Sequence, residues 1–192
     1  MENLETVKLA DGAIRVCPPP KGIVPKAGRR NCGAIDMRIA ADGQWFYHGS
    51  PILRKELVKL FASVVRRDDD GDYWLVTPAE MAKITVDDAP FIAIEMALSD
   101  GPDGSGLAFR TNVDEWVAAG PAHPIRVATD ARTGEPRPYL RLAQDGTEAL
   151  IARSVFYQLV DQAEFRTIGG ESMLAVASGG TIFPLGRAGD LP

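Results

Sequence analysis

A seven-residue stretch occurs twice in this chain, and each copy ends in the turn-forming pair Asp-Gly. The copies read MRIAADG at residues 37–43 and LRLAQDG at residues 140–146, and four of the seven positions are identical. An Asp-Gly pair after alternating apolar residues favours a tight turn at the end of a strand. The repetition therefore predicts a strand and a turn at two distant places in the chain.

Each copy is followed by a segment whose apolar residues recur at helical spacing. This spacing predicts two amphipathic helices. Ser50 before Pro51 is typical of an N-cap and a first helical turn, and Asp145 with Glu148 resembles a capping box, so we expect the helices to begin there. The apolar positions are Leu53, Leu57, Leu60, Phe61 and Val64 in the first segment and Ile151, Val155, Phe156, Leu159 and Val160 in the second.

The similarity continues after the helices, where Tyr73–Val76 corresponds to Met173–Val176 as a short apolar strand. The shared unit is strand, turn, helix, turn, strand, which indicates a duplication. Because strand candidates outnumber the two helices, we expect an α+β protein with two related halves and mostly antiparallel sheet.

Proline and glycine mark the expected domain limits. Residues 1–30 are rich in both, which predicts an extended N-terminal arm. The stretch SDGPDGSG at 99–106 is the expected seam. These limits give a first repeat domain at residues 31–103 and a second at residues 104–192.

The charge balance excludes some classes of partner. The chain has 21 basic and 26 acidic residues, a net charge of −5, which opposes nonspecific binding to nucleic acid or to an anionic membrane surface. No apolar run approaches the roughly 18 residues of a membrane span, and the first residues lack the apolar core of a secretory signal. We therefore expect a cytoplasmic protein without a membrane span, in which a local basic patch can still bind a small anion.

The sequence shows no recognisable catalytic or metal-binding motif. GxSxG, P-loop and GxGxxG patterns are absent from the printed sequence. The run DDDGD at 68–72 fails as an EF-hand because acidic ligands are missing at the first and last loop positions, which favours a solvated turn. His48, His123, Cys17 and Cys32 lack neighbours at metal-ligand spacing. We expect neither a metal nor a cofactor.

Residues 109–112, FRTN, are the first candidate ligand site. Arg110 carries a planar guanidinium group suited to phosphate or carboxylate, and Thr111 and Asn112 add short-range donors at a strand end. Arg126, in HPIRV, is a second cation nearby in the sequence. The alternative is a structural ion pair between Arg110 and an aspartate across the seam between the halves.

Two further pairs of residues are candidates. Asp87 and Asp88 precede a strand and are suited to acid–base chemistry, although adjacent side chains on an extended backbone point in opposite directions, which favours a turn. Arg54 and Arg153 align on the two expected helices and would face a common interface if the halves pack symmetrically. The alternative is that both lie on helix surfaces.

Backbone N–H groups at Ser178, Gly179 and Gly180 are suited to an anion-binding nest.

Longer motifs connect the chain to a known family. In this order the sequence contains RKELVKLFASVVRRDDDGDYWLVTPAE, ITVDDAPFIAIEM, FRTN, HPIRV, PYL, RSVFY and FPLG. With these motifs it resembles, over roughly residues 31–187, a bacterial family of unknown function, domain-of-unknown-function family twelve eighty-five. The resemblance implies a two-part α+β fold with a repeated motif, a second part superficially like a pleckstrin-homology fold, a site between the parts for a nucleotide-like ligand, and a role in signal transduction. It provides no catalytic constellation to transfer.

Three hypotheses of function follow. The leading one is a noncatalytic module that binds a small, nucleotide-like anion between the halves and passes that state to a protein partner in signal transduction. The second is an enzyme that uses Asp87 or Asp88 with Arg110 on a phosphorylated substrate. The third is a protein–protein interaction module that works through exposed apolar residues.

Overall fold

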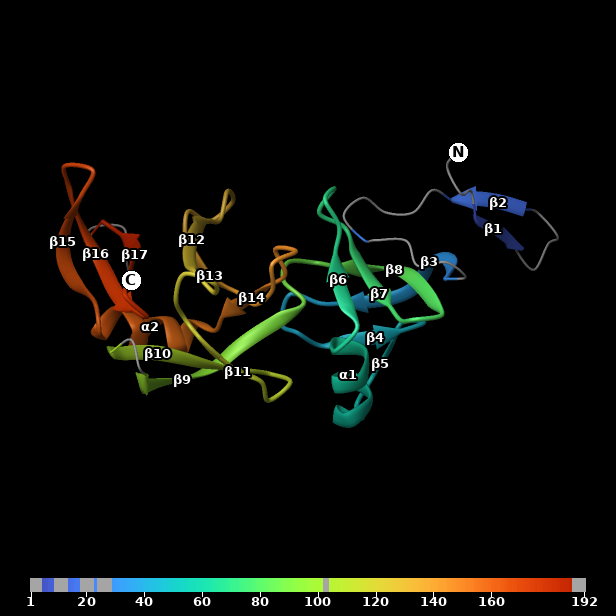
Figure 1. The fold of residues 1–192 in the computed structure, drawn as a ribbon, viewed down its shortest axis with the longest axis horizontal. Helices are drawn as coiled ribbons and strands as arrows, with labels where there is room; N and C mark the ends of the chain where they lie inside the picture. Colours follow the sequence, from blue (N-terminus) through green and yellow to red (C-terminus); the bar gives the residue numbers. More distant parts are fainter. Residues whose placement is uncertain (1–4, 9–13, 18–22, 24–28, 102–103, 188–192) are drawn as a thin grey trace. The chain divides into compact units, whose positions relative to one another are not determined.

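Strands make up 52% of the computed structural model, which describes residues 5–8, 14–17, 23, 29–101 and 104–187 (Figure 1). The chain divides into two units, Met1–Pro90 and Phe91–Pro192. Most of the expected arm at 1–30 lies outside the described residues. Within it, β1 (Glu5–Lys8) and β2 (Ile14–Cys17) form an antiparallel hairpin.

The first unit is built on a six-stranded sheet of order β5-β4-β3-β8-β7-β6. Helix α1 (Lys55–Ala62) connects β5 to β6, and its Phe61 stacks on the buried Trp45 with ring centroids 6.2 Å apart. The strands are β3 (Arg30–Ile39), β4 (Trp45–Tyr47), β5 (Ser50–Pro51), β6 (Val65–Arg67), β7 (Tyr73–Val76) and β8 (Glu80–Val86).

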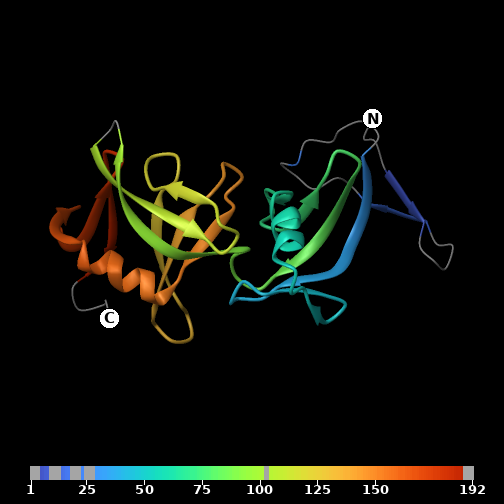
Figure 2. The ribbon, with the colours of Figure 1, turned by 90° about the horizontal axis from the view of Figure 1, so that it is seen from below.

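The second unit has a six-stranded sheet of order β11-β10-β9-β14-β13-β12 and a three-stranded sheet β15-β16-β17. Helix α2 (Arg153–Asp161) packs against β9 and β16 (Figure 2). The strands are β9 (Phe91–Gly101), β10 (Gly104–Thr111), β11 (Trp116–Ala118), β12 (Ile125–Thr129), β13 (Pro136–Arg141), β14 (Glu148–Ile151), β15 (Glu164–Ile168), β16 (Glu171–Ser178) and β17 (Thr181–Gly186).

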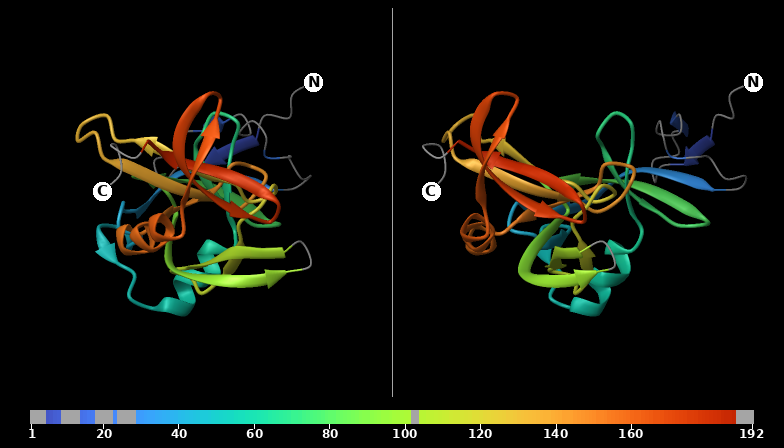
Figure 3. Two further views of the ribbon diagram at one scale, coloured as in Figure 1. Left: turned by 90° about the vertical axis from the view of Figure 1, so that its left-hand side faces the viewer. Right: turned by 60° about the vertical axis from the view of Figure 1, so that its left-hand side comes forward.

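The stretch at 99–106 joins β9 to β10 as one long hairpin. The hairpin bends strongly (Figure 3), and its register shifts between Arg110 and Thr111. A bulge of this kind bends a strand pair and increases its twist. Strand β10 is in contact with β16.

A buried serine joins the two sheets of the second unit. Ser178 Oγ accepts a hydrogen bond from the Leu107 N–H group at 2.8 Å and donates one to the Ala119 carbonyl at 2.8 Å. Gly179, at φ 53°, lets the turn approach closely, since a Cβ atom there would lie 3.1 Å from the Ala119 oxygen. The Ser178 side chain thus holds β16 to β10 and to the loop after β11.

The repeated heptapeptides form the same turn. In the first copy the Gly43 N–H donates to the Ala40 carbonyl, and in the second Gly146 donates to Ala143 at 3.2 Å. Both glycines have positive φ angles of about 80°. The aspartate of each copy accepts a backbone hydrogen bond two residues further on, at 2.9 Å. The prediction of equivalent turns is confirmed.

The predicted fold class is wrong. The protein is mostly β rather than an α+β protein with strand–turn–helix–turn–strand halves, and its helices have only 8 and 9 residues. In both units a β-hairpin, a short helix and a second hairpin follow one another. Apolar runs that we interpreted as single strands pair with their sequence neighbours into hairpins, a tertiary choice that periodicity does not specify. The pleckstrin-homology likeness was part of the same prediction and gains no support.

The expected helix starts are also wrong. Ser50 and Pro51 form β5, and Glu148 begins β14. Neither helix has a side-chain cap. Two expected core residues of the first helical segment, Leu53 and Leu60, are 84% and 62% exposed. Residues that resemble helix-capping signals therefore lie in strands here. Strand pairing can satisfy the backbone N–H and C=O groups of these residues as a helix would.

We expect Ser178→Ala to lower the free energy of unfolding by about 1–3 kcal/mol, because it leaves the buried Leu107 N–H and Ala119 carbonyl groups without this partner. Urea unfolding followed by tryptophan fluorescence measures the change. Ser172→Ala, at an exposed position in the same strand, is the control and should stay within about 0.5 kcal/mol. Equal effects of the two variants would contradict the structural role of Ser178.

Candidate functional site

A pocket opens where β13 and β14 separate. Pro136 and Pro138 in β13 have no N–H group to donate to a neighbouring strand. The pairing of β13 with β14 ends at Tyr139 and Leu150. The next N–H group after β14, that of Ala152, donates instead to β9 at 2.9 Å, and the chain turns into α2. Two prolines thus leave a space beside the first turn of a helix.

The pocket, which we call the α2 pocket, has a volume of about 190 Å³. Its wall is mainly apolar, and four charged residues line it as well. The apolar residues are Pro136, Pro138, Leu150, Ile151, Ala152 and Phe156, and the charged ones are Asp130, Glu135, Arg137 and Arg153.

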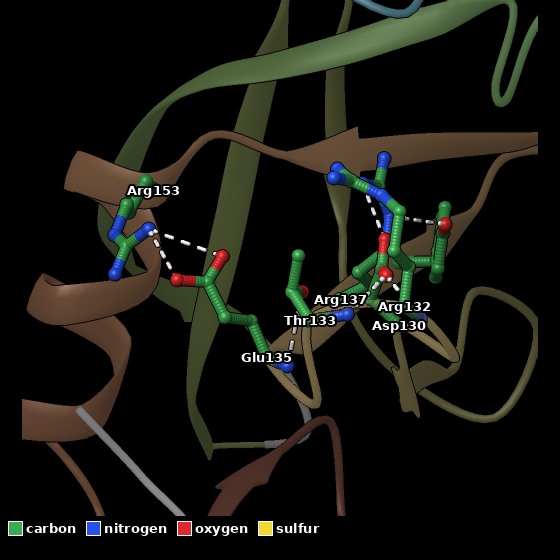
Figure 4. Close-up of polar contacts among 7 residues, drawn as sticks. Asp130, Arg132, Thr133, Glu135, Arg137 and Arg153 are labelled. Carbon is green, nitrogen blue, oxygen red and sulfur yellow. Dashed lines mark hydrogen bonds and ion pairs between the residues drawn. The ribbon is translucent and has the colours of Figure 1, made fainter.

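Arg153, the first residue of α2, faces a carboxylate at this pocket (Figure 4). Its Nη1 atom lies 3.3 and 3.4 Å from the two carboxylate oxygens of Glu135, and its Nε donates to the Tyr157 hydroxyl at 3.0 Å. The hydrogen bond to Tyr157 and then the contact with Glu135 raise the pKa of Arg153 above its ordinary value. The Arg153 and Glu135 side chains are 64% and 55% exposed, so the ion pair is weak and solvent-accessible.

The loop that carries Glu135 is fixed by Asp130. Its carboxylate accepts hydrogen bonds from the N–H groups of Arg132 at 2.9 Å and Thr133 at 3.0 Å. These two bonds, led by the one from Thr133, lower the pKa of Asp130. Arg137 Nη1 lies 3.5 Å from the same side chain, and Figure 4 shows these residues grouped in the loop and at the start of β13. The loop therefore holds Glu135 opposite Arg153 through backbone contacts.

Residues 110–112 of the FRTN stretch make structural contacts within the six-stranded sheet of the second unit and its turns. Arg110 binds Glu95 through Nε at 2.7 Å and Asp114 through Nη1 at 2.9 Å, and its contact with Glu95 leads the rise in its pKa. Thr111 is fully buried and its Oγ1 accepts the Glu115 N–H group. Asn112 Oδ1 accepts the Ile92 N–H group at 3.2 Å. Arg110 is thus paired with two carboxylates of its own unit, Glu95 and Asp114, rather than with an aspartate across the seam. Thr111 and Asn112 have turn-forming roles.

Arg126 lies on the same face of the six-stranded sheet as Arg110, which follows from strand register. Arg126 is paired with Tyr139, Tyr139 with Leu150, and Leu150 with Ile92. The bulge adds one residue to β9 between the partners of Arg110 and Thr111. With this extra residue counted, Arg110, Ile92 and Arg126 lie on one face of the sheet. Four strand spacings separate β10 from β12, which is roughly 19 Å. The two arginines do not converge on one small ligand.

Arg126 has partners of its own. Its Nε donates to Glu148 at 2.7 Å, a second hydrogen bond joins the same carboxylate, and its guanidinium carbon lies 4.2 Å from the centroid of the Tyr139 ring. The bidentate geometry fixes the orientation of the guanidinium group.

The remaining candidates belong to the first unit. Asp87 accepts two hydrogen bonds from Arg38, which lower the pKa of Asp87. Asp88 is the next residue in the chain and lies between β8 and β9. Arg54 is the N-cap residue of α1, whereas Arg153 is the first helical residue of α2, so the two arginines are offset by one position. Lys55 is the positional equivalent of Arg153.

The other sequence features have structural roles. Asp68 of the DDDGD run is buried and accepts hydrogen bonds from the Trp74 indole N–H at 2.8 Å and the Asp72 N–H at 2.7 Å, as befits a turn. His48 lies 3.2 Å from Asp36, and His123 contacts the Arg141 carbonyl. Cys32 is a free thiol. No group of three or more metal-ligating side chains was found in the described part of the chain.

Sequence reasoning named Arg153 but missed its surroundings. Glu135, Pro136 and Pro138 form much of the α2 pocket, and none was a candidate. The signal was the PRP triplet at 136–138, because two prolines spaced by one residue remove two successive donors from the same side of a strand. The two prolines open a pocket only because β14 is the strand that lies beside them, and the sequence does not show which strand that is.

Two family models match the chain in succession. The model "Domain of unknown function (DUF1285), N-terminal domain" matches residues 24–89, and "Protein of unknown function (DUF1285), C-terminal domain" matches residues 90–185. The chain belongs to the DUF1285 family. The boundary between the two DUF1285 models lies within one residue of the division between the structural units, and the two matches support the inference of a duplication.

Two crystal structures of DUF1285 proteins are similar to this chain. The one from Silicibacter pomeroyi DSS-3 is 39% identical, with 89% of this chain and 92% of that chain covered and a TM-score of 0.76. The one from Shewanella baltica OS155 is 25% identical, with 66% and 91% covered and a TM-score of 0.51. No curated protein matches this chain. Among the described residues, no helix is long and apolar enough to cross a membrane.

The Asp87–Arg38 pair gives a pH-dependent prediction. Because the folded pKa of Asp87 is lowered, the pair stabilises the fold above the unfolded pKa of about 4, and this stability is lost as the pH falls through the lower folded value. We expect Asp87→Asn to cost about 0.5–1 kcal/mol at neutral pH and progressively less below about pH 4. Urea titrations across this range test it, with the exposed Asp69→Asn as control; a cost that persists in acid would contradict the assignment.

Proposed function

We propose that this DUF1285 protein is a noncatalytic module that binds a small anionic ligand in the α2 pocket and passes the bound state to a protein partner. The observation that carries the proposal is the Glu135 carboxylate beside Arg153, at 3.3 Å. An anion already occupies a position next to an apolar pocket, and the contact is exposed enough for a ligand to displace it.

The start of α2 favours an anion at the same place. The first N–H groups of a helix have no partners within the helix, and the helix dipole adds partial positive charge there. In α2 no side chain caps these groups and the first turn contains no acidic residue. Arg153 and the first turn of α2 therefore present donors on one side, while Phe156 and Ile151 supply apolar contact.

The volume restricts the ligand. At about 190 Å³ the pocket is smaller than the roughly 300–1,000 Å³ of typical drug-sized ligand sites. This size suits a short-chain carboxylate or the phosphate end of a larger molecule. A nucleotide-like ligand would place its phosphate in the pocket and leave its base outside.

Ligand binding and the Arg153→Gln variant test the proposal. We expect butyrate, inorganic phosphate or adenosine monophosphate to raise the melting temperature of the full chain by mass action. For the ligand that binds, Arg153→Gln should lower the affinity by at least about tenfold, or 1.4 kcal/mol, in calorimetric titrations. The control is Arg166→Gln, which removes an exposed arginine paired with Glu164 in the same unit and should bind normally. The absence of any shift, or equal binding by both variants, would refute the proposal.

Glu135→Gln should have the opposite effect. Because the ligand no longer competes with a carboxylate for Arg153, we expect its affinity to rise by roughly three- to tenfold. The melting temperature without ligand should change little, since an exposed ion pair contributes about 0–1 kcal/mol. Glu164→Gln is the matched control, and calorimetry in low salt is the measurement. A weaker affinity in Glu135→Gln would show that Glu135 binds the ligand rather than occupying its place.

A further inference from the structure

Two hollows border the strands of the second unit, and they differ in the charge that they offer to a ligand. The larger one, which we call the groove, has a volume of about 760 Å³ and lies at the contacting strands β12 and β17. Pro184 of β17 pairs with Ala175 of β16 and keeps its missing donor on the open side, and among the described strands no ladder joins β17 to β12. Arg126 is the one charged residue among the described residues that line the groove.

The arginine of the groove already holds a carboxylate firmly. Both oxygens of Glu148 accept hydrogen bonds from Arg126, and the Glu148 side chain is 17% exposed. In the α2 pocket, by contrast, the Arg153 and Glu135 side chains are both exposed, and their N–O distances of 3.3 and 3.4 Å are longer than the roughly 2.7–2.9 Å of a charge-assisted hydrogen bond. Of the two arginines, Arg153 is therefore the one whose partner an incoming anion can displace.

The donors that Arg153 offers to a ligand match one carboxylate. The Tyr157 hydroxyl accepts from Nε at 3.0 Å, so an incoming anion meets the terminal nitrogen atoms of the guanidinium group. Nη1 faces both carboxylate oxygens of Glu135. A ligand carboxylate that replaces Glu135 has the same planar shape and the same two oxygen atoms, and it therefore makes the same contacts.

The other charges of the α2 pocket favour a ligand with a single negative charge. Arg137 lies 3.5 Å from Asp130 and balances that carboxylate, and its Nε donates to the Tyr139 hydroxyl at 3.1 Å. Arg153 alone then has to balance both the displaced Glu135 and the ligand. A ligand with one negative charge leaves an excess of one negative charge at Arg153, whereas a dianion leaves an excess of two, and like charges at short range repel.

The apolar lining of the α2 pocket suits an alkyl chain. Ile151 and Phe156 are buried, and Pro136 and Pro138 have no N–H group to offer to a polar ligand atom. The volume of about 190 Å³ is somewhat larger than the roughly 150 Å³ of an apolar cavity that binds benzene. A ligand of about six to eight non-hydrogen atoms fits such a space. For a linear carboxylate this size corresponds to four to six carbon atoms.

We propose that the α2 pocket binds a linear, singly charged carboxylate of about four to six carbon atoms. The ligand carboxylate takes the place of Glu135 at Arg153, and the alkyl chain lies against Phe156 and the two prolines. This inference rests on the proposed function, because it names the class of ligand for the same pocket. It ranks phosphate and dicarboxylates below monocarboxylates, so it can fail while the anion pocket itself stands.

A series of carboxylates tests the inference on the full chain, by NMR titration at neutral pH and constant ionic strength. From acetate to pentanoate, each added methylene group should raise the affinity about fourfold. Octanoate should bind no more tightly than hexanoate, because the end of its chain leaves the pocket. Succinate, which has the four carbon atoms of butyrate and a second carboxylate, should bind at least about tenfold more weakly than butyrate.

The outcomes separate the two proposals. If succinate or inorganic phosphate binds as tightly as butyrate, or if the affinity does not depend on chain length, this inference is wrong and the anion pocket stands. If neither the carboxylates nor phosphate nor adenosine monophosphate binds, both proposals are refuted.

A larger side chain in the pocket tests the inference from the protein side. Ala152, the N-cap residue of α2, lines the pocket, and Ala152→Leu fills part of the space for the alkyl chain. We expect this variant to lower the affinity for pentanoate at least about tenfold and that for acetate less than about threefold. Ala177→Leu, at an exposed position in β16, is the control and should bind both normally. Equal losses for the two ligands in folded Ala152→Leu, or no loss for either, would contradict the placement of the alkyl chain; if the variant does not fold, the carboxylate series decides.

Discussion

The hydroxyl group of Ser178 holds the two sheets of the second unit together. It accepts from β10 and donates to the loop after β11 while it lies at the end of β16, at 1% exposure. Both hollows in this unit border elements that contact β16. Helix α2, which borders the α2 pocket, packs against β9 and β16, and β17, which borders the groove, is paired with β16. A small buried polar group with both partners satisfied thus sets the spacing of two sheets.

Proline positions create both hollows. A sheet closes wherever each strand can offer N–H and C=O groups to the next, and a proline withdraws the donor. Pro136 and Pro138 end the pairing of β13 with β14 and open the α2 pocket, while Pro184 keeps β17 from pairing with β12. The charged groups then follow the backbone: Glu135 and Arg153 meet at one opening, and Arg126 borders the other. In this DUF1285 protein both hollows arise at interruptions of the hydrogen-bond ladder.

The duplicated segment shows how one local motif serves two architectures. Hairpin, helix and hairpin follow one another in both units, with the same hydrogen bonds around Gly43 and Gly146. In the first unit all the strands that follow α1 join one sheet with the first hairpin. In the second unit β15, β16 and β17 form a sheet of their own. The same local order is thus compatible with different strand pairings, because pairing depends on which edges are available.

The sequence alone determined the local elements of the protein. The Asp-Gly turns, the two amphipathic helices and the family follow from residues near one another in the chain, since turn chemistry and 3.6-residue periodicity act over short distances. It identified Arg110 and Asp87 as charged groups of interest but did not show that Glu95 and Arg38 engage them. The mostly β class, the junction made by Ser178 and the pocket at Pro136 were decided by the tertiary structure alone. Strand pairing joins residues far apart in sequence, and a missing N–H group matters only once the neighbouring strand is in place.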